Sequence, residues 1–117
     1  MAEYSLEEVQ VLVATGSFTL KATRCRDSIV EHFGCTTREA RQKFQEIVAA
    51  LTEKSISETL EQRFGQKFDI YGIEADGIGW YLKVAVDINM DGEEEVVGLS
   101  CHPLERPIKT KGGQVTP

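Results

Sequence analysis

The chain has 117 residues, of which 41% are hydrophobic and 27% charged, as in an ordinary globular domain with a single core. Its formal net charge of −6 disfavours a nonspecific nucleic-acid-binding protein, because neutralising phosphates needs an excess of Lys and Arg. No apolar run approaches the roughly 20 residues that span a bilayer, and the polar N-terminal residues are not typical of a signal peptide. Its three cysteines have no metal-binding spacing, so we expect reduced thiols in a cytoplasmic protein without metal or cofactor.

The first half of the chain contains three helix signals. Residues 5–8 form a Ser-Leu-Glu-Glu capping box, and the apolar stripe that follows ends at Gly16. A second helix is expected over about residues 23–33. A second capping box at 36–39 begins a third helix, whose apolar residues recur at spacings of three and four: Ala40, Phe44, Ile47, Val48 and Leu51.

The second half of the chain alternates between apolar and polar residues, as strands do. The sequence predicts strands over about 55–61, 68–73, 80–88 and 96–101. Asp91-Gly92, between the last two runs, is a hairpin signal. The second half therefore predicts a meander of antiparallel strands.

Helices followed by strands predict a single α+β domain over residues 1–105, with three N-terminal helices packed on one face of a small antiparallel sheet. Residues 106–117 are predicted to be a flexible basic tail. Because side chains alternate along a strand, the other face of the sheet would carry Tyr81 and Lys83, together with His102. This open face is the candidate site.

Charge is distributed unevenly along the chain. Residues 21–43 contain six basic side chains against three acidic ones, whereas residues 87–95 contain five acidic side chains and no basic one. Two interpretations remain open: a locally basic groove on an acidic protein, or solvated faces of helices and a hairpin.

The order of these elements resembles that of the MqsR-type mRNA interferases, toxins of bacterial toxin–antitoxin pairs that have a RelE-like fold. The likeness extends over residues 4–105. Its matching stretches include the Asp69-Ile70-Tyr71 run, where the family has Asp-Val-Tyr, the Tyr81-Leu82-Lys83 run and the closing Ser100. The resemblance implies a RelE-like fold, cleavage of mRNA without metal, and a cognate antitoxin protein as partner. It implies no direct contact with DNA or with a membrane.

The family's catalytic positions are mostly substituted in this chain. Glu58 stands where the family has a lysine, Phe68 stands where it has a glutamine, and His102 stands where it has a second lysine. The family's tyrosine is retained as Tyr81. The resemblance therefore carries over one of four catalytic positions.

RNA cleavage through the 2′-hydroxyl needs a base, an acid and a group that stabilises the charge on phosphorus. A carboxylate and an imidazole are a workable base and acid pair near neutral pH. We therefore predict Glu58, Tyr81 and His102 as catalytic residues, with Tyr81 orienting the phosphate. We predict Arg63 and Lys83 as substrate-binding residues that offset its charge.

Each of these residues also has an ordinary structural interpretation, as a solvated carboxylate, a surface histidine, a packing tyrosine or an edge-strand cation. The substituted family positions and the acidic net charge favour an alternative function. The protein would then be a catalytically degenerate RelE-like binding module that acts through protein–protein contact. Its acidic hairpin 87–95 would meet a basic partner.

Overall fold

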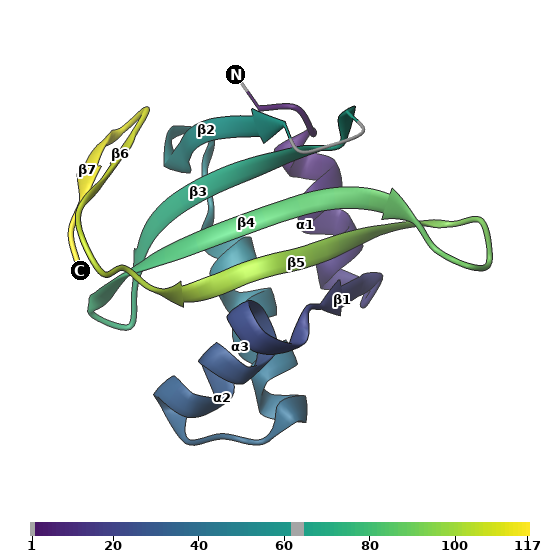
Figure 1. The fold of residues 1–117 in the computed structure, drawn as a ribbon, viewed down its shortest axis with the longest axis horizontal. Helices are drawn as coiled ribbons and strands as arrows, with labels where there is room; N and C mark the ends of the chain where they lie inside the picture. The colour runs from purple at the N-terminus through teal and green to yellow at the C-terminus, as the bar shows by residue number, and fades with distance from the viewer. Residues whose placement is uncertain (1, 62–64) are drawn as a thin grey trace.

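A mixed β-sheet forms the centre of the computed structural model, which describes residues 2–61 and 65–117 (Figure 1). Within these residues the sheet has five strands in the order β1-β5-β4-β3-β2. Neighbouring strands are antiparallel except β1, which runs parallel to β5. The strands are β1 (Phe18–Leu20), β2 (Ile56–Glu61), β3 (Lys67–Ala75), β4 (Ile78–Ile88) and β5 (Glu94–Pro103).

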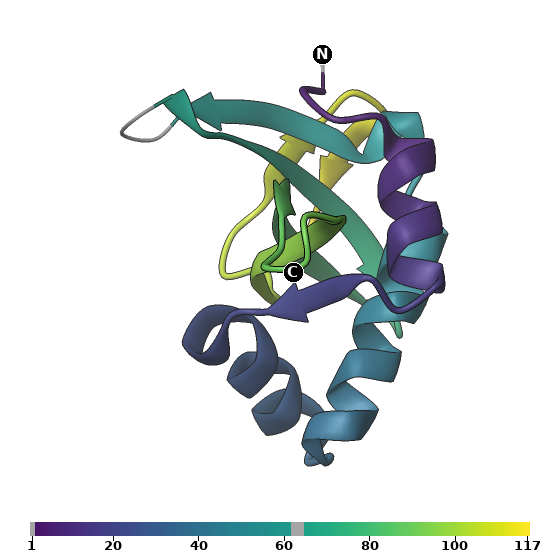
Figure 2. The same ribbon diagram turned by 90° about the vertical axis from the view of Figure 1, so that its right-hand side faces the viewer.

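The predicted helices are confirmed, and they pack on one side of the sheet (Figure 2). The Thr36–Glu39 capping box is complete: the Thr36 hydroxyl accepts from the Glu39 amide, and the Glu39 carboxylate accepts from the Thr36 amide. The helices are α1 (Leu6–Ala14), the π-helical turn η1 (Ala22–Arg26), α2 (Asp27–Phe33), α3 (Thr37–Ala50) and the 3₁₀ turn η2 (Glu53–Ser55).

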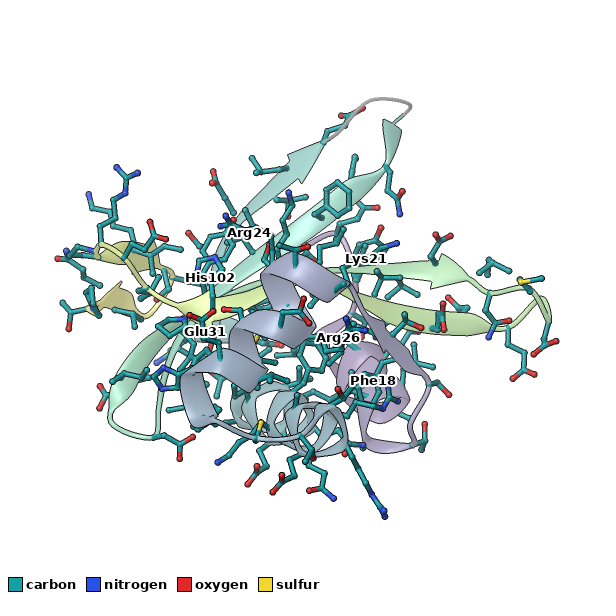
Figure 3. All side chains as sticks on the ribbon, turned by 60° about the horizontal axis from the view of Figure 1, so that its bottom comes forward. Phe18, Lys21, Arg24, Arg26, Glu31 and His102 are labelled. Atoms are coloured by element: carbon teal, nitrogen blue, oxygen red, sulfur yellow. The ribbon has the colours of Figure 1, made fainter. Side chains whose placement is uncertain are left out.

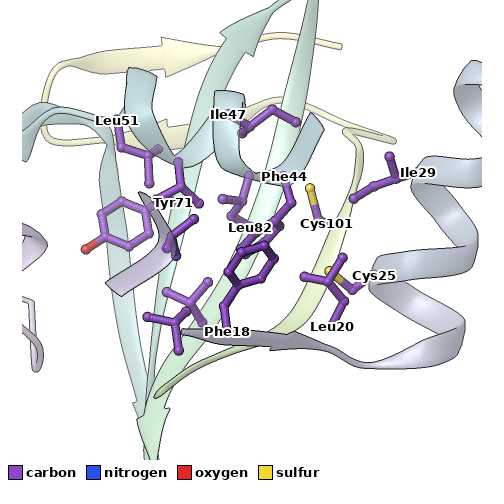
Figure 4. Packing of buried hydrophobic residues seen from close by; sticks show 14 of the residues in the cluster. Phe18, Leu20, Cys25, Ile29, Phe44, Ile47, Leu51, Tyr71, Leu82 and Cys101 are labelled. Carbon is purple, nitrogen blue, oxygen red and sulfur yellow. The ribbon is translucent and has the colours of Figure 1, made fainter. Parts of the chain in front are cut away.

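The hydrophobic core lies between this side of the sheet and the helices (Figure 4). Every second residue of β4 points into it, as the period of a strand requires. These side chains meet the apolar stripe of α3, and each buried aliphatic or aromatic group stabilises the fold by roughly 1.5–3 kcal/mol. The central members of the core are Trp80, Leu82, Val84, Val96, Phe44, Ile47 and Val48.

The predicted arrangement of N-terminal helices on an antiparallel, RelE-like sheet is wrong. The helices are interleaved with strands, because β1 lies between α1 and η1 and adds a parallel edge strand to the sheet. Phe18 and Leu20 are buried while Thr19 between them is exposed, which is the pattern of a strand. The sequence predicts a short extended piece over residues 17–20, but three residues do not show that it pairs with β5.

The segment predicted as a flexible basic tail forms a β-hairpin on the side of the sheet opposite the helices. Strands β6 (Ile108–Thr110) and β7 (Gly113–Val115) pair with each other. The hairpin lies directly on β3: a Cβ atom at Gly72 would be 2.6 Å from the Ile108 side chain. The Lys111 amide also donates to the Ile56 carbonyl at 2.9 Å. The sequence does not reveal this hairpin, because the hairpin packs on the backbone of Gly72, which is far from it in the chain and has no side chain.

Asp69 fastens the N-terminal segment to the sheet. Its carboxylate is fully buried and accepts hydrogen bonds from the Glu3 and Tyr4 amides at 2.8 and 2.9 Å. It also accepts from the Thr59 hydroxyl at 2.6 Å. These bonds compensate for the burial of a charge and join the chain ahead of α1 to β2 and β3.

A search of the described helices for a membrane-crossing segment finds none with the necessary length and apolar character.

Candidate functional site on the open face of the sheet

Tyr81, Lys83 and His102 lie on the face of the sheet opposite the helices, here called the open face. Tyr81 is paired with His102 across β4 and β5, and Lys83 is paired with Ser100 in the next position on the same face. On the other side of β4, Lys83 is paired with Ile70, which is in turn paired with Glu58 on β2. The register therefore aligns four of the predicted site residues on one face.

The Tyr81 and His102 rings are stacked, with centroids 5.0 Å apart and an interplanar angle of 15°. Both side chains are half-buried. The Nδ1 atom of His102 lies 2.9 Å from the Pro103 carbonyl oxygen, which can only accept, so Nδ1 carries a proton. Nε2 lies 3.2 Å from an Nη atom of Arg24, which can only donate, so Nε2 is an acceptor. These two partners fit the tautomer of His102 that carries its proton on Nδ1 and its lone pair on Nε2.

Arg24 is the site residue that sequence reasoning missed. It lies in η1, and Figure 3 shows its side chain beside His102, with Lys21 and Arg26 on the same segment. The next residue, Cys25, is fully buried and contacts Cys101 of β5. A hydrogen bond to Cys25, together with burial, raises the pKa of the Cys101 thiol. This buried contact holds η1 beside the end of β5. The excess of basic residues over 21–43 was the feature of the sequence that could have pointed to Arg24.

The surroundings of Tyr81 raise the pKa of its phenol further above neutral pH. Burial and then the negative charge of Glu58 raise the pKa of the Tyr81 phenol, while the positive charge of Arg24 acts in the opposite direction. The hydroxyl is therefore a hydrogen-bond donor at neutral pH. Glu58 itself is exposed on the edge strand β2 and acts on the site through its charge. Three strand spacings, roughly 14 Å, separate its backbone from that of His102.

Two clefts meet at the Arg24–His102 pair. The first has a volume of about 520 Å³, with Tyr81, Lys83 and Ser100 on its floor and residues 104–108 as one wall. The second, of about 710 Å³, lies between α2 and the end of β5, and its lining includes Asp27 and Glu31. An extended chain that crossed from one cleft to the other would pass directly over the pair.

The predicted substrate-binding residues fall in different places. Lys83 lines the first cleft, where its Nζ atom lies 4.8 Å from the centroid of the Phe68 ring. Arg63 lies outside the described residues. Over residues 2–61 and 65–117, no group of three or more His, Cys, Asp or Glu side chains is placed to hold a metal ion. The catalytic and binding roles of the predicted residues stay predictions.

Comparisons of the chain with protein-family models, with curated protein sequences and with solved structures found no match.

Proposed function

We propose that the protein is a metal-independent endoribonuclease that cleaves mRNA, and that it is the toxin of a toxin–antitoxin pair. One observation carries the proposal: an imidazole, a phenol and a guanidinium meet on the open face, at His102, Tyr81 and Arg24. The resemblance to MqsR-type interferases supports it, since the family's tyrosine is retained as Tyr81. The same resemblance supplies the proposed partner, a cognate antitoxin protein.

The His102 Nε2 atom supplies the base. Its lone pair takes the proton of the RNA 2′-hydroxyl, and the 2′-oxygen then forms a bond to phosphorus. The bond from phosphorus to the 5′-oxygen breaks. The products are a 2′,3′-cyclic phosphate and a free 5′-hydroxyl. This role uses the acceptor nitrogen that the hydrogen bond of Nδ1 to the Pro103 carbonyl defines.

Tyr81 supplies the acid. The departing 5′-oxygen is an alkoxide, nearly as basic as hydroxide. A phenol whose pKa is moderately raised is still much more acidic and can protonate it. Tyr81 then recovers a proton from His102, which returns both groups to their starting states. Lys83 and Arg24 offset the charge of the phosphate, and Glu58 helps keep the phenol protonated.

The test is cleavage of a defined RNA by purified protein in the presence of a metal chelator. We expect His102→Ala and Tyr81→Phe each to slow cleavage by about 10²–10⁴-fold, the usual contribution of a positioned acid or base. Tyr4→Phe is the matched control, because its hydroxyl bonds to the Lys67 carbonyl away from the site. Wild-type rates in both site variants, or no cleavage by the wild type, contradict the proposal.

In cells, we expect expression of the chain to arrest growth and to degrade mRNA, and co-expression of the antitoxin to relieve both effects. The proposal places this activity in the cytoplasm, where the free cysteines Cys25, Cys35 and Cys101 stay reduced. Growth arrest that is identical in the wild type and His102→Ala would separate toxicity from the proposed site.

The hairpin between β4 and β5 favours a second candidate function, protein binding without catalysis. It extends beyond the sheet (Figure 1) and carries the acidic run 87–95. Two apolar side chains are exposed on it, Ile88 at 59% and Met90 at 104% of the reference area. Such a surface suits a basic partner with an apolar anchor. Charge reversal at Glu93 and Glu94 that abolishes the biological effect, in a protein that cleaves no RNA, would establish this second function.

A further inference from the structure

The nitrogen that the proposed reaction needs is not free in the substrate-free protein. The Nε2 atom of His102 lies 3.2 Å from an Nη atom of Arg24. Because a guanidinium has no acceptor, this contact is an N–H donated into the Nε2 lone pair. A 2′-hydroxyl cannot transfer its proton to that lone pair until Arg24 moves away.

The other two contacts of the imidazole would stay in place during such a movement. Tyr81 stacks on the face of the ring, and the Pro103 carbonyl oxygen holds Nδ1. Both contacts fix the ring plane and leave the Nε2 edge pointing at Arg24. Releasing Arg24 therefore exposes Nε2 without any rearrangement of the imidazole.

Arg24 has no competing ion pair in the described part of the chain. The acidic residue nearest to Arg24 in sequence is Asp27, and its carboxylate is paired with Arg26 at 3.0 Å. The Arg24 side chain is exposed and lines both clefts. Its guanidinium is thus available to a ligand that arrives over the His102 ring.

We infer that Arg24 blocks His102 until a phosphodiester of the substrate draws the guanidinium away and is then bound by it. This inference rests on the proposed nuclease function. The exchange is favourable because hydrogen bonds from a guanidinium to a phosphate are roughly twice as strong as bonds between neutral groups, and they can form in pairs. The same movement frees the base and places a positive charge on the phosphate where negative charge will develop.

The first test observes the His102 side-chain nitrogens by NMR. In the free wild-type protein, Nδ1 should resonate as protonated and Nε2 as an acceptor in a hydrogen bond. The probe is a single-stranded RNA oligonucleotide with 2′-O-methyl groups, which has phosphates but no nucleophile. Its addition should shift the Nε2 resonance toward the value in the free Arg24→Ala protein. An unchanged Nε2 resonance, whether the oligonucleotide fails to bind or binds elsewhere, overturns the inference.

The second test is kinetic. Arg24→Ala should lower kcat by about 10²–10³-fold, the usual effect of removing one donor to a developing oxyanion, and should raise KM. Arg24→Lys should recover part of KM but little of kcat, because an ammonium cannot form the paired bonds of a guanidinium. Arg26→Ala is the matched control, a loss of positive charge on the same segment from a residue that is already paired.

The outcomes separate this inference from the proposed function. If the wild type cleaves RNA and Arg24→Ala cleaves it equally well, the inference is wrong and the nuclease function stands. If the oligonucleotide shifts the Nε2 resonance but the wild type cleaves no RNA, the nuclease function is wrong and the release of Arg24 by a phosphate stands.

Discussion

The two faces of the sheet use alternate residues of the same strands for different purposes. On the core face, Trp80, Leu82 and Val84 are at most 1% exposed and contribute to the hydrophobic core. On the open face, Tyr81 and Lys83 are half-buried beside polar groups. Since consecutive side chains of a strand point in opposite directions, the sequence can change one face without disturbing the other. Packing in the core and the chemistry proposed for the open face can therefore be changed separately at neighbouring residues of one strand.

The two faces are also covered differently. The core face meets large side chains of α3, with Phe44 stacked against Phe18 at 5.5 Å between ring centroids. One end of the open face is instead covered by the C-terminal segment, which lies on the bare backbone of Gly72 and Gly79. The wall formed by residues 104–108 turns the remainder of that face into the first cleft. The open face therefore contains a shaped cleft and is not a flat exposed surface.

The largest expected effect tests the separation of the faces at two consecutive residues. Trp80→Ala should lower the free energy of unfolding by about 3–5 kcal/mol, the usual result of truncating a buried tryptophan. The indole is fully buried, stacks on Phe33 and donates to the Ala75 carbonyl at 3.1 Å. Tyr81→Phe should change the same quantity by less than about 1 kcal/mol, because it removes only a hydroxyl group. Urea denaturation measures both values.

Comparable destabilisation by Trp80→Ala and Tyr81→Phe would contradict the comparison. It would mean that the phenol of the open face is as important to folding as the indole of the core. The reduced cleavage expected of Tyr81→Phe would then report loss of structure and not loss of an acid.

A smaller effect tests the cover on the open face. A Cβ atom at Gly79 would collide with the Thr116 backbone and approach the Leu104 side chain to 2.7 Å. Gly79→Ala should therefore lower the free energy of unfolding by about 1–3 kcal/mol, as overpacking does, and lift the C-terminal segment. Hydrogen exchange measures the second consequence: the Lys111 and Gly112 amides, which bond to the Ile56 and Lys54 carbonyls, should exchange faster.

The Lys21 amide is the internal control for this variant. It donates to the Gly98 carbonyl at 2.9 Å beside β1, on the other edge of the sheet. Its exchange rate should stay unchanged. Equal acceleration at Lys21 and Lys111 would mean that the substitution loosens the whole domain and that the hairpin is not a separately docked cover.

Local patterns in the sequence predicted the elements that are long enough to show a period. The capping boxes and apolar stripes indicated the helices, and alternation along β4 placed Tyr81 and Lys83 on one face. The sequence indicated an extended piece over residues 17–20, but not that it is a sheet strand, because its pairing with β5 joins distant parts of the chain. The sequence did not indicate Arg24 as a site residue for the same reason. Its place beside His102 depends on β1 leading η1 to the end of β5, which no local pattern encodes.

The last comparison takes one tyrosine from each face at alkaline pH. Burial, and then the charge of Asp69, raise the pKa of Tyr71 on the core face to about 12, whereas a tyrosine in an unfolded chain has a pKa of about 10. The folded state thus holds this proton more tightly than the unfolded state. The resulting stabilisation is complete below about pH 10 and is lost as the pH rises toward 12. Tyr71→Phe should reduce this alkaline loss of stability, measured by urea denaturation at a series of pH values.

Tyr81→Phe gives the counterpart on the open face. The pKa of Tyr81 is raised by burial and Glu58 but is opposed by Arg24, so its removal should change the alkaline loss less than removal of Tyr71 does. Absorbance of tyrosinate in each variant identifies which phenol titrates later. A higher pKa for Tyr81 than for Tyr71 would mean that the open face disfavours a charged phenolate more strongly than the core face does. The phenol of Tyr81 would then be a weaker acid than that of Tyr71, and the contrast between the core face and the open face would fail at this pair of residues.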